Sequence, residues 1–216
     1  MRLVILNPIM KKLFWIVLLL LAAYLLYKFA FKKEQVEKEK PKAVSVSAHT
    51  DVFNNSVENV LTQYYALTDA FVNWDSTAVR TAGLALQTAL SDFNVEELKK
   101  DSTIYETALY PLEISKVSVG SVLDNNDWEQ KRRALQDLSE SIRMLLLTVK
   151  YDNSIAYWQE CPMAFGAETI GNWLSAKEEV VNPYLGNKDP KYGATMLNCG
   201  EVKEKIDFTV TDTIGH

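Results

Sequence analysis

Residues 128–150, WEQKRRALQDLSESIRMLLLTVK, carry the clearest structural pattern of this chain. Their apolar side chains recur at intervals of three, four and seven residues: Trp128, Leu135, Leu138, Ile142, Leu145 and Val149. Such intervals place side chains on one face of an α-helix, which has about 3.6 residues per turn. Because charged and polar residues fill most of the remaining positions, the stretch predicts an amphipathic helix that buries one face against neighbouring helices.

The same pattern occurs earlier in the chain. An apolar stripe about six turns long runs from Phe53 to Trp74. A second amphipathic segment follows it, and either Asp75 or Ser76 is expected to cap its N-terminus, because both side chains accept hydrogen bonds from free helical N–H groups. Both segments therefore predict helices that pack through one apolar face.

A third helix is expected at about residues 96–123, although its apolar residues are less regularly spaced. Pro111 should kink or divide it, since proline has no N–H to donate and its ring crowds the preceding turn. The polar residues 124–127, DNND, then predict a turn. Together with the helix at 128–150, these segments indicate an antiparallel four-helix bundle over residues 51–150.

The helical period is lost after the bundle. Residues 155–159 and 201–206 have the composition of strands, and residues 173–175 are expected to begin a short helix or turn. We therefore predict a mainly α protein in which a small C-terminal β/loop module (α+β), residues 151–206, packs on one end of the bundle. A polar tail, residues 207–216, follows.

This module contains both cysteines and two of the five methionines of the protein, arranged as Cys161-x-Met163 and Met196-x-x-Cys199. Residues two apart share one face of a strand, and residues three apart share one side of a turn or helix. If the fold brings the two pairs together, four soft sulfur donors converge, which suits Cu(I) or Ag(I). Trp173 would then either cover the site or pack in the core.

Two other interpretations of these sulfur atoms stay open. In the first, Cys161 and Cys199 form a disulfide and the methionines fill the core. Such a link contributes about 3–4 kcal/mol and persists in an oxidising compartment. In the second, both thiols are reduced and simply buried.

Catalytic chemistry has little support in this sequence. The cysteines are not in a C-x-x-C arrangement, no histidine adjoins either of them, and no Gly-rich phosphate loop is present. The two histidines, His49 and His216, lie in a predicted tether and in the predicted tail. Zinc-enzyme and triad chemistry therefore have no basis, and we expect a protein that is not an enzyme.

Residues 13–27, LFWIVLLLLAAYLLY, form a run without a charge. Extended through Lys28 to Phe31, the run has nineteen residues, or roughly 28 Å of helix, which is close to the thickness of a bilayer core. No small-x-small cleavage site follows closely, so the run predicts an uncleaved signal anchor within residues 1–31, with the membrane as partner through residues 13–31. Residues 32–50 are then expected to form a polar tether.

Charge is unevenly distributed along the chain. Residues 1–48 hold nine basic and three acidic residues, a net charge of +6, and the remaining residues hold 14 and 25, a net charge of −11. A domain this acidic is poorly suited to a phosphate backbone, so nucleic acid is not an expected partner. Because more lysines follow the apolar run than precede it, counting Lys and Arg does not by itself support export of the domain.

The C-terminal module also carries an ordered series of short sequence boxes. They are Tyr157, Cys161-Pro162-Met163-Ala164, Trp173-Leu174-Ser175, Asn182-Pro183-Tyr184, Met196-Leu197 and Cys199-Gly200. Placed after a four-helix region, this series resembles a bacterial domain family of unknown function that is common in Bacteroidetes. Members occur as exported proteins and as fusions behind the periplasmic adaptor subunits of copper/silver RND efflux pumps. The resemblance covers about residues 50–206.

This resemblance implies an envelope location and a link to copper or silver handling. Together with the predicted anchor, it leads us to expect a single-pass protein of the bacterial inner membrane whose domain lies in the periplasm, with an efflux adaptor or another envelope protein as partner. Family members often have a histidine just before the Cys-Pro-Met box, where this chain has Gln159 and Glu160. A nitrogen ligand is therefore missing here. The resulting expectation is an envelope domain that binds Cu(I) or Ag(I), and the alternative is a disulfide-stapled interaction or structural domain that binds no metal.

Overall fold

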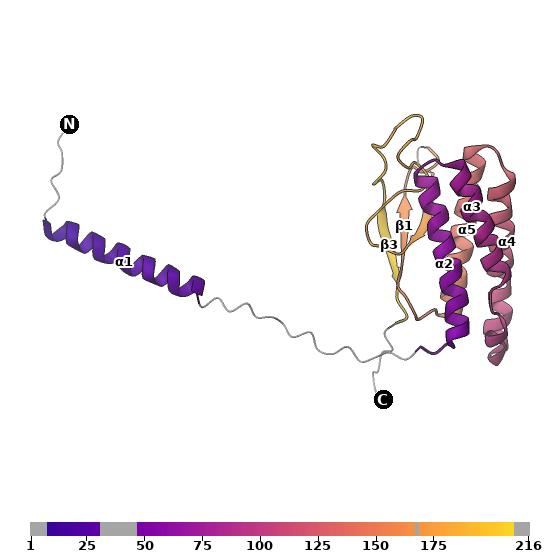
Figure 1. The fold of residues 1–216 in the computed structure, drawn as a ribbon, viewed down its shortest axis with the longest axis horizontal. Coiled ribbons are helices and arrows are strands. Elements are labelled where there is room, and N and C mark those ends of the chain that lie inside the picture. The colour runs from indigo at the N-terminus through magenta and orange to yellow at the C-terminus, as the bar shows by residue number, and fades with distance from the viewer. Residues whose placement is uncertain (1–7, 31–46, 167–168, 210–216) are drawn as a thin grey trace. The chain divides into compact units, whose positions relative to one another are not determined.

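A computed structural model of the chain describes residues 8–30, 47–166 and 169–209 (Figure 1). The chain divides into two compact units, residues 1–44 and 45–216. The first unit contains the helix α1, Pro8–Ala30, on which the described apolar side chains are exposed. The predicted tether lies outside the described residues up to residue 46, and the predicted tail lies outside them from residue 210.

The apolar run near the N-terminus is helical, as predicted. In the parts of the chain that the structure describes, however, no helix is both long enough and apolar enough to cross a membrane. The predicted membrane span at residues 13–31 is therefore not supported by the described residues.

The second unit is built on four helices, which are labelled in Figure 1. They are α2 (Asp51–Val72), α3 (Ser76–Ser91), α4 (Ser102–Asp124) and α5 (Trp128–Val149), with the short 3-10 helix η1 (Glu96–Lys100) before α4. The apolar stripe predicted for residues 128–150 is the buried face of α5, where Leu135, Leu138 and Ile142 have no solvent exposure. The helix period thus predicted both the existence of α5 and the face that it buries.

Aspartate side chains begin three of these helices. Asp75 caps α3 by accepting hydrogen bonds from the N–H groups of Thr77 and Ala78, both at 2.9 Å, which confirms one of the two predicted caps. Asp101 and Asp127 cap α4 and α5 in the same way. Each carboxylate satisfies helical N–H groups that have no partner within the helix, a contribution of about 1 kcal/mol per cap.

Pro111 does not divide the third helix, contrary to one of the two outcomes predicted for it. It lies inside α4, and the break in this region comes earlier, between η1 and α4. The cap at Asp101 is the physical reason, because it gives α4 a favourable start ten residues before the proline. Packing of α4 against α3 and α5 then holds the helix together although the Thr107 carbonyl receives no N–H from Pro111.

Three antiparallel strands follow the bundle in the order β2-β1-β3. They are β1 (Ala156–Cys161), β2 (Gly171–Ser175) and β3 (Glu201–Ile206). The strands predicted at 155–159 and 201–206 are confirmed, but residues 173–175 belong to a strand and not to a helix or turn. Trp173 pairs with Gln159 of β1. Three residues are too few to show the alternation of apolar and polar side chains that predicts a strand.

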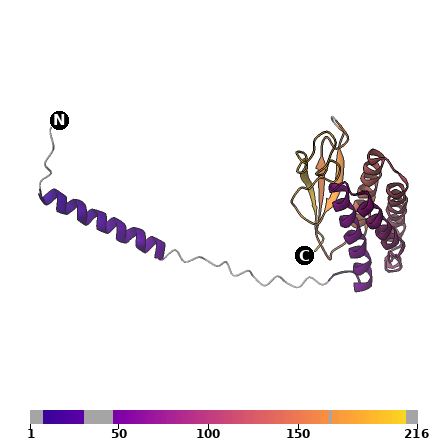
Figure 2. The same cartoon turned by 45° about the horizontal axis from the view of Figure 1, so that its top comes forward.

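The sheet lies along the side of the bundle, next to α2, and not on one end as predicted (Figures 1 and 2). Two hydrogen bonds from the β2 backbone fix this position: the Asn172 N–H donates to Gln136 Oε1 of α5 at 2.6 Å, and the Leu174 N–H donates to the Tyr64 hydroxyl of α2 at 3.1 Å. Helices and strands share one buried core. Both views place α4 on the far side of the bundle from the sheet.

Candidate functional site

Cys161 is the last residue of β1, and the structure buries it completely. Its strand partner is Gly171 of β2. A Cβ added at Gly171 would lie 2.9 Å from ring atoms of Tyr184 and would also collide with Ala164. The end of the strand is therefore tightly packed, and Cys161 lies in a place from which bulk water is excluded.

Cys199 approaches from the loop that leads into β3. Its N–H donates to the Met196 carbonyl at 3.0 Å, which closes a turn, and its carbonyl accepts from Asn182 Nδ2 at 3.0 Å. Asn182 is buried, and its Oδ1 accepts the N–H groups of Tyr184 and Leu185. The side chain of Asn182 thus connects two loop segments and fixes the backbone at Cys199.

The backbone at Gly200 brings this loop against β1. Gly200 has a φ of +139°, a backbone conformation that residues other than glycine rarely adopt. A Cβ there would lie 2.5 Å from the Glu160 carbonyl oxygen and 3.1 Å from Cη2 of Trp173. Since Glu160 precedes Cys161 and Gly200 follows Cys199, this close approach places the two cysteines side by side.

Cys161 and Cys199 are free thiols in mutual contact, which we call the thiol pair. Burial, then a hydrogen bond with Cys161, and then the charge of Cys161 raise the pKa of the Cys199 thiol to about 12. At neutral pH Cys199 therefore keeps its proton, and a metal ion that binds here must displace it. The same proximity of the two thiols is a requirement of a disulfide between them.

Alkylation by iodoacetamide measures this raised pKa. At about pH 8, a thiol with a pKa near 12 has a thiolate population about 1,000-fold smaller than that of an ordinary cysteine, so Cys199 should react about 1,000-fold more slowly in the folded protein than in urea. The rate should keep rising about tenfold per pH unit up to about pH 11. A folded-state rate that reaches a plateau near pH 9 would contradict the assignment.

The methionines are less closely associated with the thiol pair. Met196 is half-buried and packs against the core, three residues before Cys199. Met163 lies in the turn after β1, where it is 36% exposed. The structure thus brings Cys161 and Cys199 together, keeps Met196 on the same loop, and leaves Met163 nearer the surface. Within the described residues, no group of three or more His, Cys, Asp or Glu side chains is placed to hold a metal ion.

Trp173 and Gln159 line the same face of the sheet as Cys161. Trp173 is 2% exposed, and its ring reaches the backbone beside Cys199. Gln159 is fully buried, and its Nε2 donates to the carbonyls of Lys177, Glu178 and Glu179 at 3.0–3.2 Å, whereas its Oε1 has no partner among the described atoms. Gln159 therefore holds the loop that follows β2.

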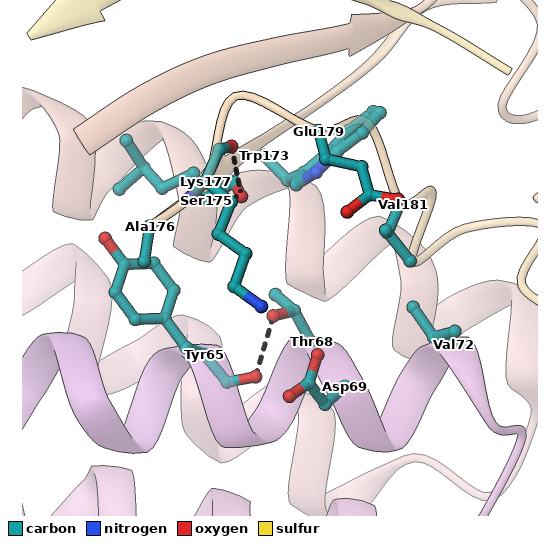
Figure 3. A pocket seen from close by; sticks show the side chains of 11 residues that line it. Tyr65, Thr68, Asp69, Val72, Trp173, Ser175, Ala176, Lys177, Glu179 and Val181 are labelled. Carbon is teal, nitrogen blue, oxygen red and sulfur yellow. Dashed lines mark hydrogen bonds between the residues drawn. The ribbon is translucent and has the colours of Figure 1, made fainter. Parts of the chain in front are cut away.

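That loop forms one wall of a pocket of about 240 Å³, which is drawn in Figure 3. The Lys177 side chain extends from the loop toward Thr68 and Asp69 of α2, and the Glu179 side chain lies beside Val181. Trp173 lines the pocket too, and its ring also reaches the backbone beside Cys199. No sequence pattern predicts this pocket, because it depends on β2, the strand that positions the loop.

The fold and the site together define a mainly helical domain with a side-mounted three-stranded sheet and a thiol pair in which Cys161 is buried and Cys199 is partly buried. Residues 60–154 match the model of a protein family described as "Protein of unknown function (DUF3347)". The matched residues run from within α2 to just before β1, so the thiol pair lies outside them. No curated protein and no solved structure matches this chain.

Proposed function

We propose that this protein binds a soft metal ion, Cu(I) or Ag(I), at the thiol pair of Cys161 and Cys199. The observation that carries the proposal is the contact between these two thiols, which come from β1 and from a loop 38 residues later in the sequence. Thiolate sulfur is the protein donor that soft ions prefer. Met196 is the thioether best placed to join them, with Met163 as a more exposed fourth donor.

The residues around the thiol pair favour a metal ion that is held by sulfur atoms, with no further charged ligand. Two thiolates would carry two negative charges into a buried place, and a bound cation compensates part of this charge. Trp173 and the tightly packed strand end at Gly171 limit access of water, as the proposed covering role of Trp173 requires. The donor set is then sulfur only, which disfavours zinc enzymes and harder ions.

We further propose that the apolar run of residues 13–31 anchors the protein in the bacterial inner membrane and that the domain acts in the periplasm in heavy-metal handling or efflux. The support is the uncharged run of residues 13–27 together with the resemblance to domains fused behind efflux adaptor subunits. In this proposal the protein is a copper or silver chaperone or a sensor accessory, and not an enzyme. An efflux adaptor or another envelope protein is its proposed partner.

Competition between the reduced full-length protein and a chromophoric Cu(I) chelator tests the metal proposal. We expect one equivalent of Cu(I) to leave the chelator. Because Cu(I) displaces the Cys199 proton, the apparent affinity for Cu(I) should rise between about pH 6 and 8. The rise should be about tenfold per pH unit for each proton released. An affinity that does not change with pH, or no transfer of Cu(I), would contradict binding at the thiol pair.

The alternative function is a disulfide-stapled interaction or structural domain that binds no metal. The same contact between Cys161 and Cys199 favours it, because two adjacent thiols form a disulfide when an oxidant removes two electrons and two protons. The intact mass of protein isolated without reductant distinguishes the two functions. A mass lower by two hydrogens, together with no Cu(I) uptake after reduction, would establish the alternative.

A further inference from the structure

A groove between α4 and α5 is lined by a cluster of exposed apolar side chains. Its volume is about 370 Å³, and α4 lines it with Tyr110, Pro111, Ile114 and Val117. Tyr110 is 66% exposed and Val117 is 65% exposed, and Met144 of α5 is exposed beside them. Exposed apolar side chains scattered singly are ordinary, but a cluster that lines one groove indicates an interaction site.

The three faces of α5 show why this groove is left open. One face, with Leu135 and Ile142, is buried in the core, and a second face contacts the sheet through the hydrogen bond from Asn172 to Gln136. The third face carries Asp137, Glu140 and Met144 and borders the groove. Since the sheet covers the other side of the bundle, no described element of this domain covers the third face (Figures 1 and 2).

The two walls of the groove differ in chemistry. On α4, Tyr110, Ile114, Val117 and Ser121 succeed one another at intervals of four, three and four residues and line about three turns of the groove. The first three are apolar, and Ser121 is polar. On α5, the wall is acidic. Among the described residues, neither Asp137 nor Glu140 forms an ion pair, and Gln136 Nε2 donates to Glu140 Oε1 at 2.6 Å and so orients that carboxylate.

We propose that the α4/α5 groove binds an amphipathic helix of a partner protein, with an apolar face against Tyr110 and Val117 and a basic edge against Asp137 and Glu140. A groove between two helices with one apolar wall accepts a third helix of about three turns. The unpaired carboxylates select the charge of that helix. Met144 adapts to the shape of the incoming side chains because its side chain is flexible. This surface is independent of the thiol pair.

Two synthetic helical peptides test the proposal by fluorescence anisotropy. Both carry the same leucine face, and one has lysines along the edge where the other has glutamates. Full-length protein in non-ionic detergent should bind the lysine peptide, with binding to empty micelles subtracted. The Tyr110→Ser/Val117→Ser variant should bind it at least about tenfold more weakly, because both apolar contacts are lost.

Two further variants show how much of the peptide affinity depends on the groove itself and how much on its acidic charge. Leu84→Ser removes an exposed apolar side chain on α3, away from the groove, and should change the affinity by less than about twofold. Asp137→Asn/Glu140→Gln should weaken the lysine peptide about threefold to fivefold and should remove its advantage over the glutamate peptide. All replaced side chains are exposed, so the variants should fold normally.

The proposal fails if the lysine peptide shows no saturable binding, if the groove variant and Leu84→Ser weaken it equally, or if the glutamate peptide binds as well. It also fails if wild-type protein is a dimer that Tyr110→Ser/Val117→Ser converts to a monomer while neither binds the peptide. In that case the groove is an interface between two copies of this chain.

Discussion

Replacing Cys199 by serine is expected to lower the affinity of the protein for Cu(I) by about 1,000-fold or more. Loss of a residue that only hydrogen-bonds a metal ligand typically lowers metal affinity by about 10–100-fold. Loss of one of two thiolates should lower it more, because it removes a direct bond to the ion. Cys199 is only partly buried, so serine should be accommodated in the fold. The measurement is chelator competition on reduced protein.

The methionines supply matched controls for this experiment. Met196→Leu should weaken Cu(I) binding by roughly tenfold, because Met196 shares a turn with Cys199, and Met163→Leu should weaken it less, because Met163 is the more exposed. Both changes nearly conserve side-chain volume and hydrophobicity. If Cys199→Ser reduced the affinity no more than Met163→Leu does, the thiol pair would not be the site.

Gly200→Ala is expected to destabilise the domain by about 3 kcal/mol or more and to abolish tight Cu(I) binding. The new Cβ would meet the Glu160 carbonyl at 2.5 Å, and the φ of +139° is strained for any residue with a side chain. The loop must then move away from β1, which separates Cys199 from Cys161. Urea unfolding gives the free energy, and chelator competition gives the affinity.

Gly166→Ala is the matched control for this change. Gly166 also has a positive φ, +115°, but a Cβ there would meet none of the described atoms within 4 Å. The substitution should therefore cost only the strain of the backbone, about 1–2 kcal/mol, and Cu(I) affinity should be unchanged. Equal losses of stability and of affinity in both variants would show that the close approach of Gly200 to β1 does not position the thiols.

Much of the helical fold could be predicted from the sequence, because helix packing leaves a period in the residues. The apolar stripe of α5 and the cap at Asp75 are local features, so the residues of a single helix are enough to predict each of them. The course of α4 through Pro111 was less predictable. It depends on packing against α3 and α5, which no local pattern records.

The site was predictable in its residues but not in its geometry. The sequence offered Cys161, Met163, Met196 and Cys199 as donors, and the structure brings the two thiols into contact while Met163 lies at the surface. The contact depends on Gly200, and its positive φ is not visible in the sequence. The predicted position of the module on one end of the bundle failed for a related reason: the hydrogen bonds of Asn172 and Leu174 to the bundle join residues distant in sequence.

X-ray absorption at the copper edge, on the one-to-one complex of the reduced protein, tests most directly whether the thiol pair holds a soft ion. We predict a first shell made only of sulfur, which loses part of its amplitude in the Cys199→Ser variant. A smaller sulfur amplitude in Cys199→Ser than in the wild-type protein would assign Cys199 as a ligand. A first shell of nitrogen or oxygen, or a spectrum that Cys199→Ser leaves unchanged, would contradict the proposed site.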